Sequence, residues 1–212
     1  MSRKKIIAGN WKMNVKPSET AALVKAIAEA TAAYADKVEI VCCTPAIDVL
    51  EAVAAAKGTK IGVGTENCHW EDHGAFTGEI STGMIVDTGA TYVITGHSER
   101  RQYFGETDET VNKRTTAAIK AGLTCMMCVG ETLDEREADL VNEVIGRQLK
   151  VGLKGLTAHG MPQSSCAHSF AAASSAYPRF EAMRTKIFLS SSRTAAISGR
   201  TWSKRWRIKS CV

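Results

Sequence analysis

Short apolar runs alternate with longer segments of mixed polarity along the first three quarters of the chain. Five apolar runs have the length and boundaries of strands buried in a parallel sheet, at 5–8, 38–43, 60–64, 91–95 and 123–129. Each is followed by a segment of helical character, at 18–34, 46–56, 80–88, 108–121 and 133–151. Gly58, Gly89 and Gly122 stand where three of these helices should end, because glycine adopts the left-handed conformation without a side-chain clash. The repeating unit is a strand followed by a helix.

Consecutive strand–helix units indicate an α/β protein, since a strand, a helix and a parallel strand form a right-handed crossover that lays the helix over the sheet. Two architectures fit this order. An open doubly wound sheet would normally carry a G-x-G-x-x-G phosphate loop after the first strand, whereas residues 9–14 read GNWKMN. A closed (β/α) barrel instead places polar, reactive residues at the ends of several strands. The sequence has this second pattern and therefore favours the barrel.

The polar residues at the predicted strand ends would all face one rim of such a barrel. They are Asn10 and Lys12 after the first run, Glu66, Asn67 and His69 after the third, His97, Ser98 and Glu99 after the fourth, and Glu131 after the fifth. Lysine supplies a compact positive charge, asparagine and histidine supply directional donors, and glutamate can hold the lysine in place. This combination suits a small anionic, oxygenated substrate.

The composition is that of an ordinary globular protein, with 212 residues of which 44% are hydrophobic and 23% charged. No run approaches the roughly 18 apolar residues that a membrane span needs. The basic start of the chain is followed by only four apolar or small residues before Asn10, which does not fit a secretory signal. Seven cysteines without an export signal suggest reduced thiols, so we expect a cytoplasmic protein with free cysteines.

The net charge of +5 is unevenly distributed along the chain. Residues 1–157 carry 18 Lys+Arg against 21 Asp+Glu, a net charge of −3, whereas residues 158–212 carry 9 against one, a net charge of +8. We therefore divide the chain into a unit of strands and helices over 1–157 and an atypical basic, serine- and arginine-rich tail over 158–212. We expect this tail to be disordered or irregular.

Four short motifs are identified in the first region: GNWKMN at 9–14, GAFTGE at 74–79, GHSERR at 96–101 and CVGE at 128–131. In this order and at these separations they resemble the triosephosphate isomerase family, over about residues 3–157. The resemblance implies an incomplete (β/α) TIM barrel, with about five of the eight units recognisable. It also implies a cytoplasmic homodimer without a cofactor, and interconversion of dihydroxyacetone phosphate and glyceraldehyde 3-phosphate in glycolysis and gluconeogenesis.

The resemblance assigns roles to five residues of the rim. Lys12 would be a catalytic and substrate-binding residue that stabilises the substrate phosphate and the charge of the enediolate, with Asn10 beside it as a substrate-binding amide. His97 would be catalytic and polarise the carbonyl oxygens as a neutral imidazole. Glu99 would hold Lys12 in place, and Ser98 would lie near the catalytic base. In the same way, the loop from residue 67 to 79 would be the arm that inserts into the partner subunit.

The family's catalytic base has no counterpart in this sequence. It is a glutamate after the sixth strand, within a motif that also forms a lid, and the nearest echo, AYPRFE at 176–181, lacks a glutamate after the tyrosine, so the base is not assigned to Glu181. Loss of a positioned general base typically lowers a rate by about 10²–10⁴-fold. Five strands would also leave an unpaired sheet edge after 123–129. The alternative function is therefore a catalytically silent fragment, truncated or frameshifted near Ala158, that acts at most as an interaction module.

Three further patterns have simpler interpretations. The CMMC run at 125–128 has redox spacing, but Cys125 and Cys128 would lie on opposite faces of a strand, so we interpret both as core residues. His69 and His73 are four residues apart in a predicted loop, where helical spacing has no meaning, and we predict no metal site. The WSKRWR run at 202–207 is easily produced by any Arg- and Ser-rich segment, so we expect neither nucleic acid nor a membrane as a partner.

Overall fold

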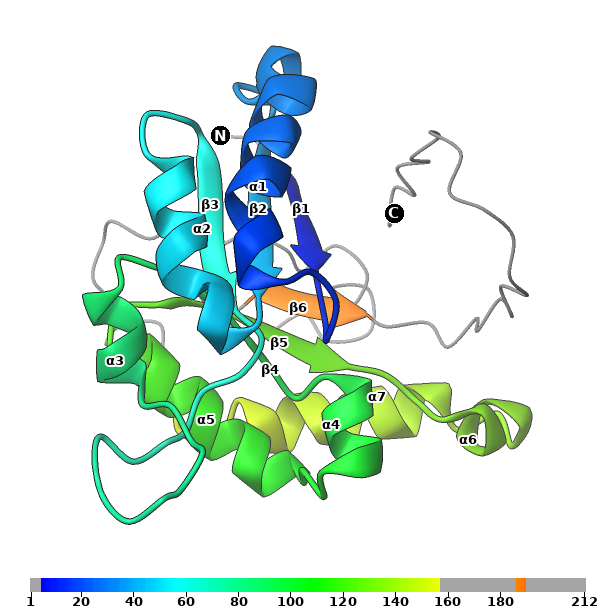
Figure 1. Ribbon diagram of the computed structural model, residues 1–212. Helices are drawn as coiled ribbons and strands as arrows, with labels where there is room; N and C mark the ends of the chain where they lie inside the picture. The colour runs from blue at the N-terminus through cyan, green and yellow to red at the C-terminus, as the bar shows by residue number, and fades with distance from the viewer. Residues whose placement is uncertain (1–4, 157–185, 190–212) are drawn as a thin grey trace.

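The protein forms a curved, entirely parallel sheet. The computed structural model describes residues 5–156 and 186–189. The strands are β1 (Lys5–Asn10), β2 (Val38–Thr44), β3 (Ile61–Thr65), β4 (Tyr92–Thr95), β5 (Thr124–Val129) and β6 (Lys186–Leu189). They lie in sequence order, and each pairs in parallel with the next. Figure 1 shows the strand direction turning between β1–β3 and β4–β5, as in part of a barrel wall. The observed fold is the predicted incomplete TIM barrel.

Seven α-helices and two short 3₁₀ helices belong to the described part of the chain. They are α1 (Pro17–Thr31), η1 (Ala32–Tyr34), η2 (Ala46–Asp48), α2 (Val49–Ala56), α3 (Thr82–Asp87), α4 (Ser98–Tyr103), α5 (Asp108–Lys120), α6 (Leu133–Glu137) and α7 (Val141–Gly152). Helix α2 packs against β2 and β3 with α1 beside it, and α5 and α7 pack against β5 (Figure 1). None of the described helices is both long and apolar enough to cross a bilayer.

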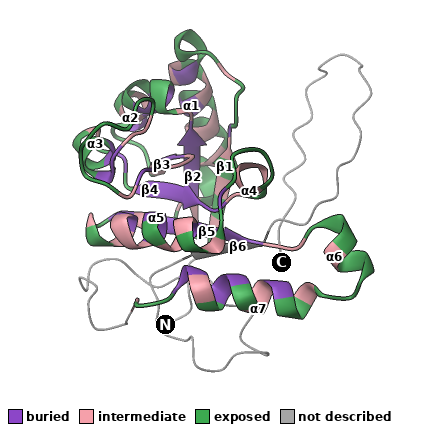
Figure 2. Ribbon diagram, turned by 90° about the horizontal axis from the view of Figure 1, so that it is seen from below, coloured by how far each residue is buried: buried purple, intermediate pink, exposed green. Residues whose placement is uncertain are grey.

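The core has two main layers because successive strand residues point to opposite faces of the sheet. The layer under α1, α2 and α5 contains Cys42, Val63, Val93 and Cys125 from the strands. The layer on the other face contains Val41, Cys43, Ile94, Met126 and Cys128. Figure 2 shows the central strands buried, while the helices expose their outer faces.

The cysteines of the described region are free and buried. Cys125 and Cys128 belong to different core layers, which confirms that the CMMC run fills the two faces of β5. Burial raises the pKa of Cys125 to about 11 and that of Cys128 to about 12. Both thiols are therefore protonated at neutral pH and unreactive as nucleophiles.

The five strands predicted from the sequence are all present, and the three helix-ending glycines have the expected backbone conformation. Gly58, Gly89 and Gly122 have φ angles of 77°, 88° and 84°. The predicted helix over 133–151 is wrong as a single element, because α6 ends at Glu137 and α7 begins at Val141. Asp139 between them has a φ of 57°, which interrupts the helical path.

Two elements were missed by the sequence pattern. Helix α4 is only six residues long, too short for apolar periodicity to identify it. Strand β6 lies within the basic tail and pairs with β5 from Met126 to Val129. The expectation of an unpaired edge beside this strand is therefore wrong for those four residues. The rest of the tail, including Glu181 and the run at 202–207, lies outside the described residues.

Candidate functional site

Asn10 and Lys12 are placed at the rim by the end of β1. The main-chain N–H of Trp11 donates to the Cys43 carbonyl oxygen at 3.0 Å, and the Trp11 side chain is buried, which fixes the chain where it leaves the sheet. Lys12 follows with a φ of 55°, a left-handed conformation that is strained for a residue with a side chain. Its N–H donates to Asn10 Oδ1 at 3.2 Å. The amide NH₂ group of Asn10 therefore remains the end that can donate to a ligand.

Lys12 and Glu99 join the first and fourth strand–helix units. Lys12 Nζ lies 2.5 Å from Glu99 Oε1, although the two residues are 87 positions apart in sequence. The side chains are 48% and 42% exposed. The ion pair orients the ammonium group but leaves it accessible, as the anion-binding prediction requires.

His97 follows β4 and caps the first turn of α4. Its Nδ1 accepts a hydrogen bond from the Glu99 N–H at 3.2 Å, so this nitrogen carries no proton. Burial lowers the pKa of His97 below its ordinary value, with Lys12 acting in the same direction and Glu99 in the opposite one. The ring is therefore neutral at pH 7 with its proton on Nε2. The 3.5 Å contact of Nδ1 with Glu99 Oε2 is accordingly not an ion pair at that pH.

Ser98 is the first residue of α4 and is exposed at the same rim. No described contact tests its predicted position near a catalytic base. The geometry thus brings together Lys12, His97 and Glu99, with Asn10 adjacent, and the role of Ser98 stays a prediction.

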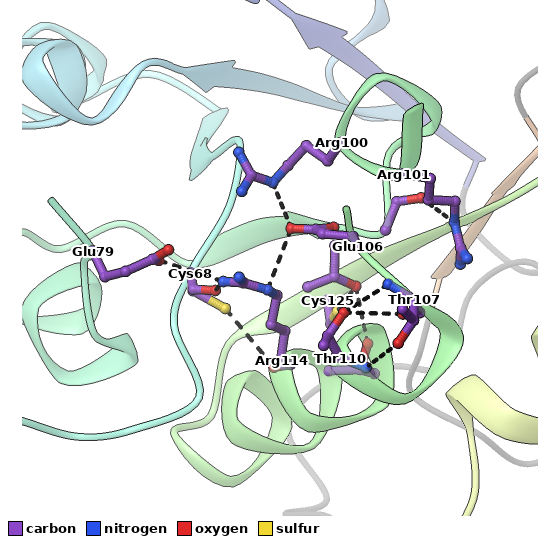
Figure 3. Close-up of polar contacts among 12 residues, drawn as sticks. Cys68, Glu79, Arg100, Arg101, Glu106, Thr107, Thr110, Arg114 and Cys125 are labelled. Atoms are coloured by element: carbon purple, nitrogen blue, oxygen red, sulfur yellow. Dashed lines mark hydrogen bonds and ion pairs between the residues drawn. The ribbon is translucent and has the colours of Figure 1, made fainter. Parts of the chain in front are cut away.

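A buried ionic network lies behind this rim (Figure 3). Glu106 Oε1 is 2.5 Å from Arg100 Nε on α4 and 3.3 Å from Arg114 Nε on α5. The Glu106 side chain is only 2% exposed and that of Arg114 is 7% exposed. Because Arg100 is three residues after His97, Glu106 anchors the helix that carries the histidine.

The same network holds both ends of the predicted arm at 67–79. Arg114 donates to the main-chain carbonyl oxygen of Cys68 and lies 3.5 Å from the carboxylate of Glu79. Its guanidinium group also lies over the Trp70 ring, 4.9 Å from the ring centroid. Arg114 thus fixes the base of the arm against α5.

Within the arm, three aromatic rings pack together. The His69 ring is stacked on Trp70 at 4.2 Å between centroids and lies 4.4 Å from the Phe76 ring. His69 Nδ1 accepts a hydrogen bond from the Glu71 N–H at 3.1 Å. The residues that the structure describes contain no group of three or more His, Cys, Asp or Glu side chains that could hold a metal ion.

Glu66, which follows β3, has a strongly perturbed carboxyl group. Burial raises its pKa to about 7, and the nearby charges of Asp48 and Glu99 act in the same direction, against the influence of Lys12. Its Oε1 atom is buried without a hydrogen-bond partner. Among the rim carboxylates, Glu66 is thus close to half-protonated at neutral pH.

Gln148 positions the end of the fifth unit. Its Oε1 accepts from the Gly130 N–H at 2.8 Å, and its Nε2 donates to the Gly130 carbonyl oxygen at 3.0 Å. Gln148 is 5% exposed, and its side chain bonds the N–H and the carbonyl oxygen of Gly130 as a neighbouring strand would. Glu131, the next residue, is held by an ion pair with Arg136.

Sequence reasoning identified the rim residues but missed the residues that support them. Arg100 lies within the GHSERR motif, yet Glu106, Arg114 and Gln148 belong to no motif that was recognised. Charged residues and glutamines are usually solvated, so a single sequence gives no sign that these side chains are buried.

The geometry defines the class of protein first. An incomplete parallel barrel with an accessible lysine, a neutral histidine and an amide at the carboxyl ends of its strands is typical of α/β-barrel proteins that bind small anionic ligands at that rim. The comparisons with known proteins identify the particular family. The chain matches the family model for triosephosphate isomerase over residues 5–168. The chain belongs to the triosephosphate isomerase family.

Individual relatives agree with this assignment. The chain is 50% identical over 157 residues to the triosephosphate isomerase of Lactobacillus delbrueckii subsp. bulgaricus, covering 74% of this chain and 62% of that protein. It is 54% identical over 156 residues to the enzyme of Endomicrobium trichonymphae, covering 73% and 62%. The crystal structure of triosephosphate isomerase from Bartonella henselae is similar with a TM-score of 0.68 and 42% identity, covering 74% of this chain and 65% of that one. The chain thus spans about three fifths of the length of the curated relatives that it matches.

Proposed function

We propose that the protein is a triose-phosphate isomerase, which interconverts dihydroxyacetone phosphate and glyceraldehyde 3-phosphate through an enediolate. The observation that carries the proposal is the pairing of a neutral His97, protonated on Nε2, with an accessible Lys12 held by Glu99. These two groups supply the electrophilic half of the reaction. Family membership supports a triose phosphate as the substrate.

His97 and Lys12 have distinct roles in this proposal. The Nε2–H of His97 donates to the substrate oxygens, where negative charge develops as the enediolate forms. A neutral donor suits this step because the acidity of a neutral imidazole N–H is closer to that of an enediol than the acidity of an imidazolium is. Lys12 binds the phosphate and compensates the added charge, and the Asn10 amide donates beside it.

Removal of the carbon-bound proton needs a carboxylate, which the described rim residues do not provide in the family's position. The sixth strand ends at Leu189 and is followed by three serines at 190–192. Ser98 is proposed to lie near the base when a base is present. The alternative of a silent fragment rests on this missing carboxylate, whereas the family assignment at about 50% identity favours the isomerase.

Homodimerisation and a cytoplasmic location are also proposed from family membership. Large apolar side chains remain exposed at the carboxyl rim of this single chain: Met13 after β1 is 97% exposed, Ile47 after β2 is 77% exposed, and Phe76 in the arm is 43% exposed. Burial of such side chains against a second copy would be favourable. The arm held by Arg114 is the segment proposed to contact the partner.

The test is a coupled isomerisation assay combined with calorimetric binding of dihydroxyacetone phosphate to the purified chain. We expect binding that is weakened at least tenfold by Lys12→Ala, and turnover that is abolished by Lys12→Ala or His97→Ala. Lys60→Ala is the matched control, because Lys60 also forms an exposed ion pair, with Asp36, but directly precedes β3 and so lies at the amino end of that strand, opposite the rim. Binding without turnover would support the silent fragment, and the absence of both would contradict the proposal.

A further inference from the structure

The peptide group that joins Trp11 to Lys12 is held by two asparagine side chains. On one side, Nδ2 of Asn14 donates to the Trp11 carbonyl oxygen at 2.7 Å. On the other side, the Lys12 N–H donates to Asn10 Oδ1 at 3.2 Å. Both hydrogen bonds act on the same peptide plane, which is rigid because the C–N bond has partial double-bond character. The orientation of this plane is therefore fixed immediately before the lysine.

The fixed plane matters because Lys12 has an unfavourable backbone conformation. Its φ of 55° brings the Cβ atom close to main-chain atoms, and Val15 in the same turn has a φ of 47°. Such conformations persist only where surrounding contacts enforce them. If the plane were free to turn, Lys12 would relax to a negative φ and its Cα–Cβ bond would leave the main chain in another direction. The ammonium group would then move away from Glu99, which lies 2.5 Å from it.

The two ends of the turn are anchored independently of Asn14. At the start, the Trp11 N–H is bonded to the Cys43 carbonyl oxygen of β2, and the Trp11 side chain is buried. At the end, the Lys16 N–H donates to Glu19 Oε2 at 3.1 Å in the first turn of α1. Loss of the Asn14 amide should therefore alter the turn and leave the flanking strand and helix folded.

We propose that Asn14 is a positioning residue of the anion site, because its side-chain amide holds the Trp11–Lys12 peptide so that the Lys12 ammonium group faces the substrate phosphate. Asn14 acts through Lys12 and does not touch the ligand. The inference rests on the proposed function, since it takes Lys12 as the phosphate-binding cation. Asn14 is part of the GNWKMN motif, in which the family resemblance assigned roles only to Asn10 and Lys12.

The first test measures the backbone of Lys12 by NMR on the full chain. The coupling constant between the N–H and Hα protons of Lys12 reports φ, and we expect Asn14→Ala to change it. Asn112→Ala is the matched control, because the Asn112 amide also donates to main-chain carbonyl oxygens, those of Gly152 and Lys154, both at 3.0 Å and outside the rim. The control should leave the Lys12 coupling unchanged. Asn14→Asp keeps the shape of the side chain but lacks its N–H donors, so it should change the coupling even if the alanine variant does not fold.

The second test measures binding of dihydroxyacetone phosphate by calorimetry. We expect Asn14→Ala to weaken binding about tenfold, because small errors in the position of a binding group are costly. Asn112→Ala should leave the affinity unchanged. In the Lys12→Ala background, Asn14→Ala should cause no further loss, because two residues that act through one contact are not additive. This double-mutant cycle separates a positioning role from direct contact with the ligand.

Three results would overturn the inference: a Lys12 coupling constant that Asn14→Ala and Asn14→Asp leave unchanged, an equal loss of affinity with Asn112→Ala, or a further loss when Asn14→Ala is added to Lys12→Ala. The two tests also separate this inference from the proposed function. A changed coupling in a chain whose wild type binds no dihydroxyacetone phosphate would count against the proposed function and leave the hold of Asn14 on Lys12 standing. Binding by the wild type with an unchanged coupling in both variants would do the reverse.

Discussion

Two ion pairs formed by neighbouring residues of α4 each join a basic side chain to a glutamate, but they serve different purposes. At the rim, Lys12 and Glu99 are 2.5 Å apart and about half exposed. Behind the helix, Arg100 and Glu106 are also 2.5 Å apart, but the glutamate is 2% exposed and shares its oxygen with Arg114. Distance alone therefore does not distinguish them. The exposed pair keeps a cation available to a ligand, whereas the buried network connects α4, α5 and the arm.

The largest loss in the free energy of unfolding is expected for Glu106→Gln. This substitution leaves Arg100 and Arg114 without a buried counter-charge, and breaking one side of a buried pair typically destabilises a protein by about 3–5 kcal/mol. Urea unfolding followed by circular dichroism measures the change. Glu99→Gln is the matched control, for which we expect a change below about 1 kcal/mol, since exposed pairs contribute little. Equal destabilisation by the two substitutions would refute the contrast between the pairs.

A slightly smaller loss in the free energy of unfolding is expected for Gln148→Leu. This substitution compares a buried neutral side chain with the buried ion pairs of Glu106. The substitution removes both hydrogen bonds to Gly130 and leaves the partly buried N–H and carbonyl groups of Gly130 without these partners. Each unsatisfied buried group costs about 1–3 kcal/mol, and because Gly130 is only partly buried we expect a total loss in the lower part of the range for two groups, about 2–4 kcal/mol. Gln102→Ala, at an exposed position of α4, should have little effect in the same unfolding measurement. A negligible loss with Gln148→Leu would show that water replaces both bonds.

Glu66→Gln is expected to stabilise the protein instead, and the gain in the free energy of unfolding should depend on pH. Because the carboxyl pKa is raised from 4.5 to about 7, the folded state binds the proton more tightly than the unfolded chain does. The stability of the wild-type protein therefore decreases as the pH rises from 4.5 to about 7, and the decrease is complete above that pH. The neutral glutamine avoids that loss, so its advantage should grow to roughly 2–3 kcal/mol at pH 8 and be small at pH 5.

Urea unfolding at the two pH values measures this difference. Glu29→Gln, at an exposed position of α1, is the control and should show no comparable dependence on pH. An advantage of Glu66→Gln that is the same at pH 5 and pH 8 would mean that the glutamine acts through packing rather than through the carboxyl charge.

The sequence predicted the strands well and the helices less well, for a physical reason. Runs such as 38–43 are apolar because both faces of a central parallel strand are buried, and this constraint acts locally on every residue. The break between α6 and α7 depends instead on one left-handed residue, Asp139, which carries no compositional sign. β6 was missed because a four-residue strand in a Ser- and Arg-rich context is defined by its neighbour β5 and not by its own pattern.

The sequence by itself determined the strand–helix order, the two-faced burial of the cysteines in β5 and the positions of Asn10, Lys12 and His97 at strand ends. These features follow from local periodicity and from motifs, which need no knowledge of distant contacts. The family resemblance already paired Glu99 with Lys12, but only the tertiary structure decided that Nδ1 of His97 is the acceptor and that Glu106 is buried between two arginines. The physical reason is that charge state and hydrogen-bond direction depend on burial and on partners far away in the chain, which the fold alone brings together.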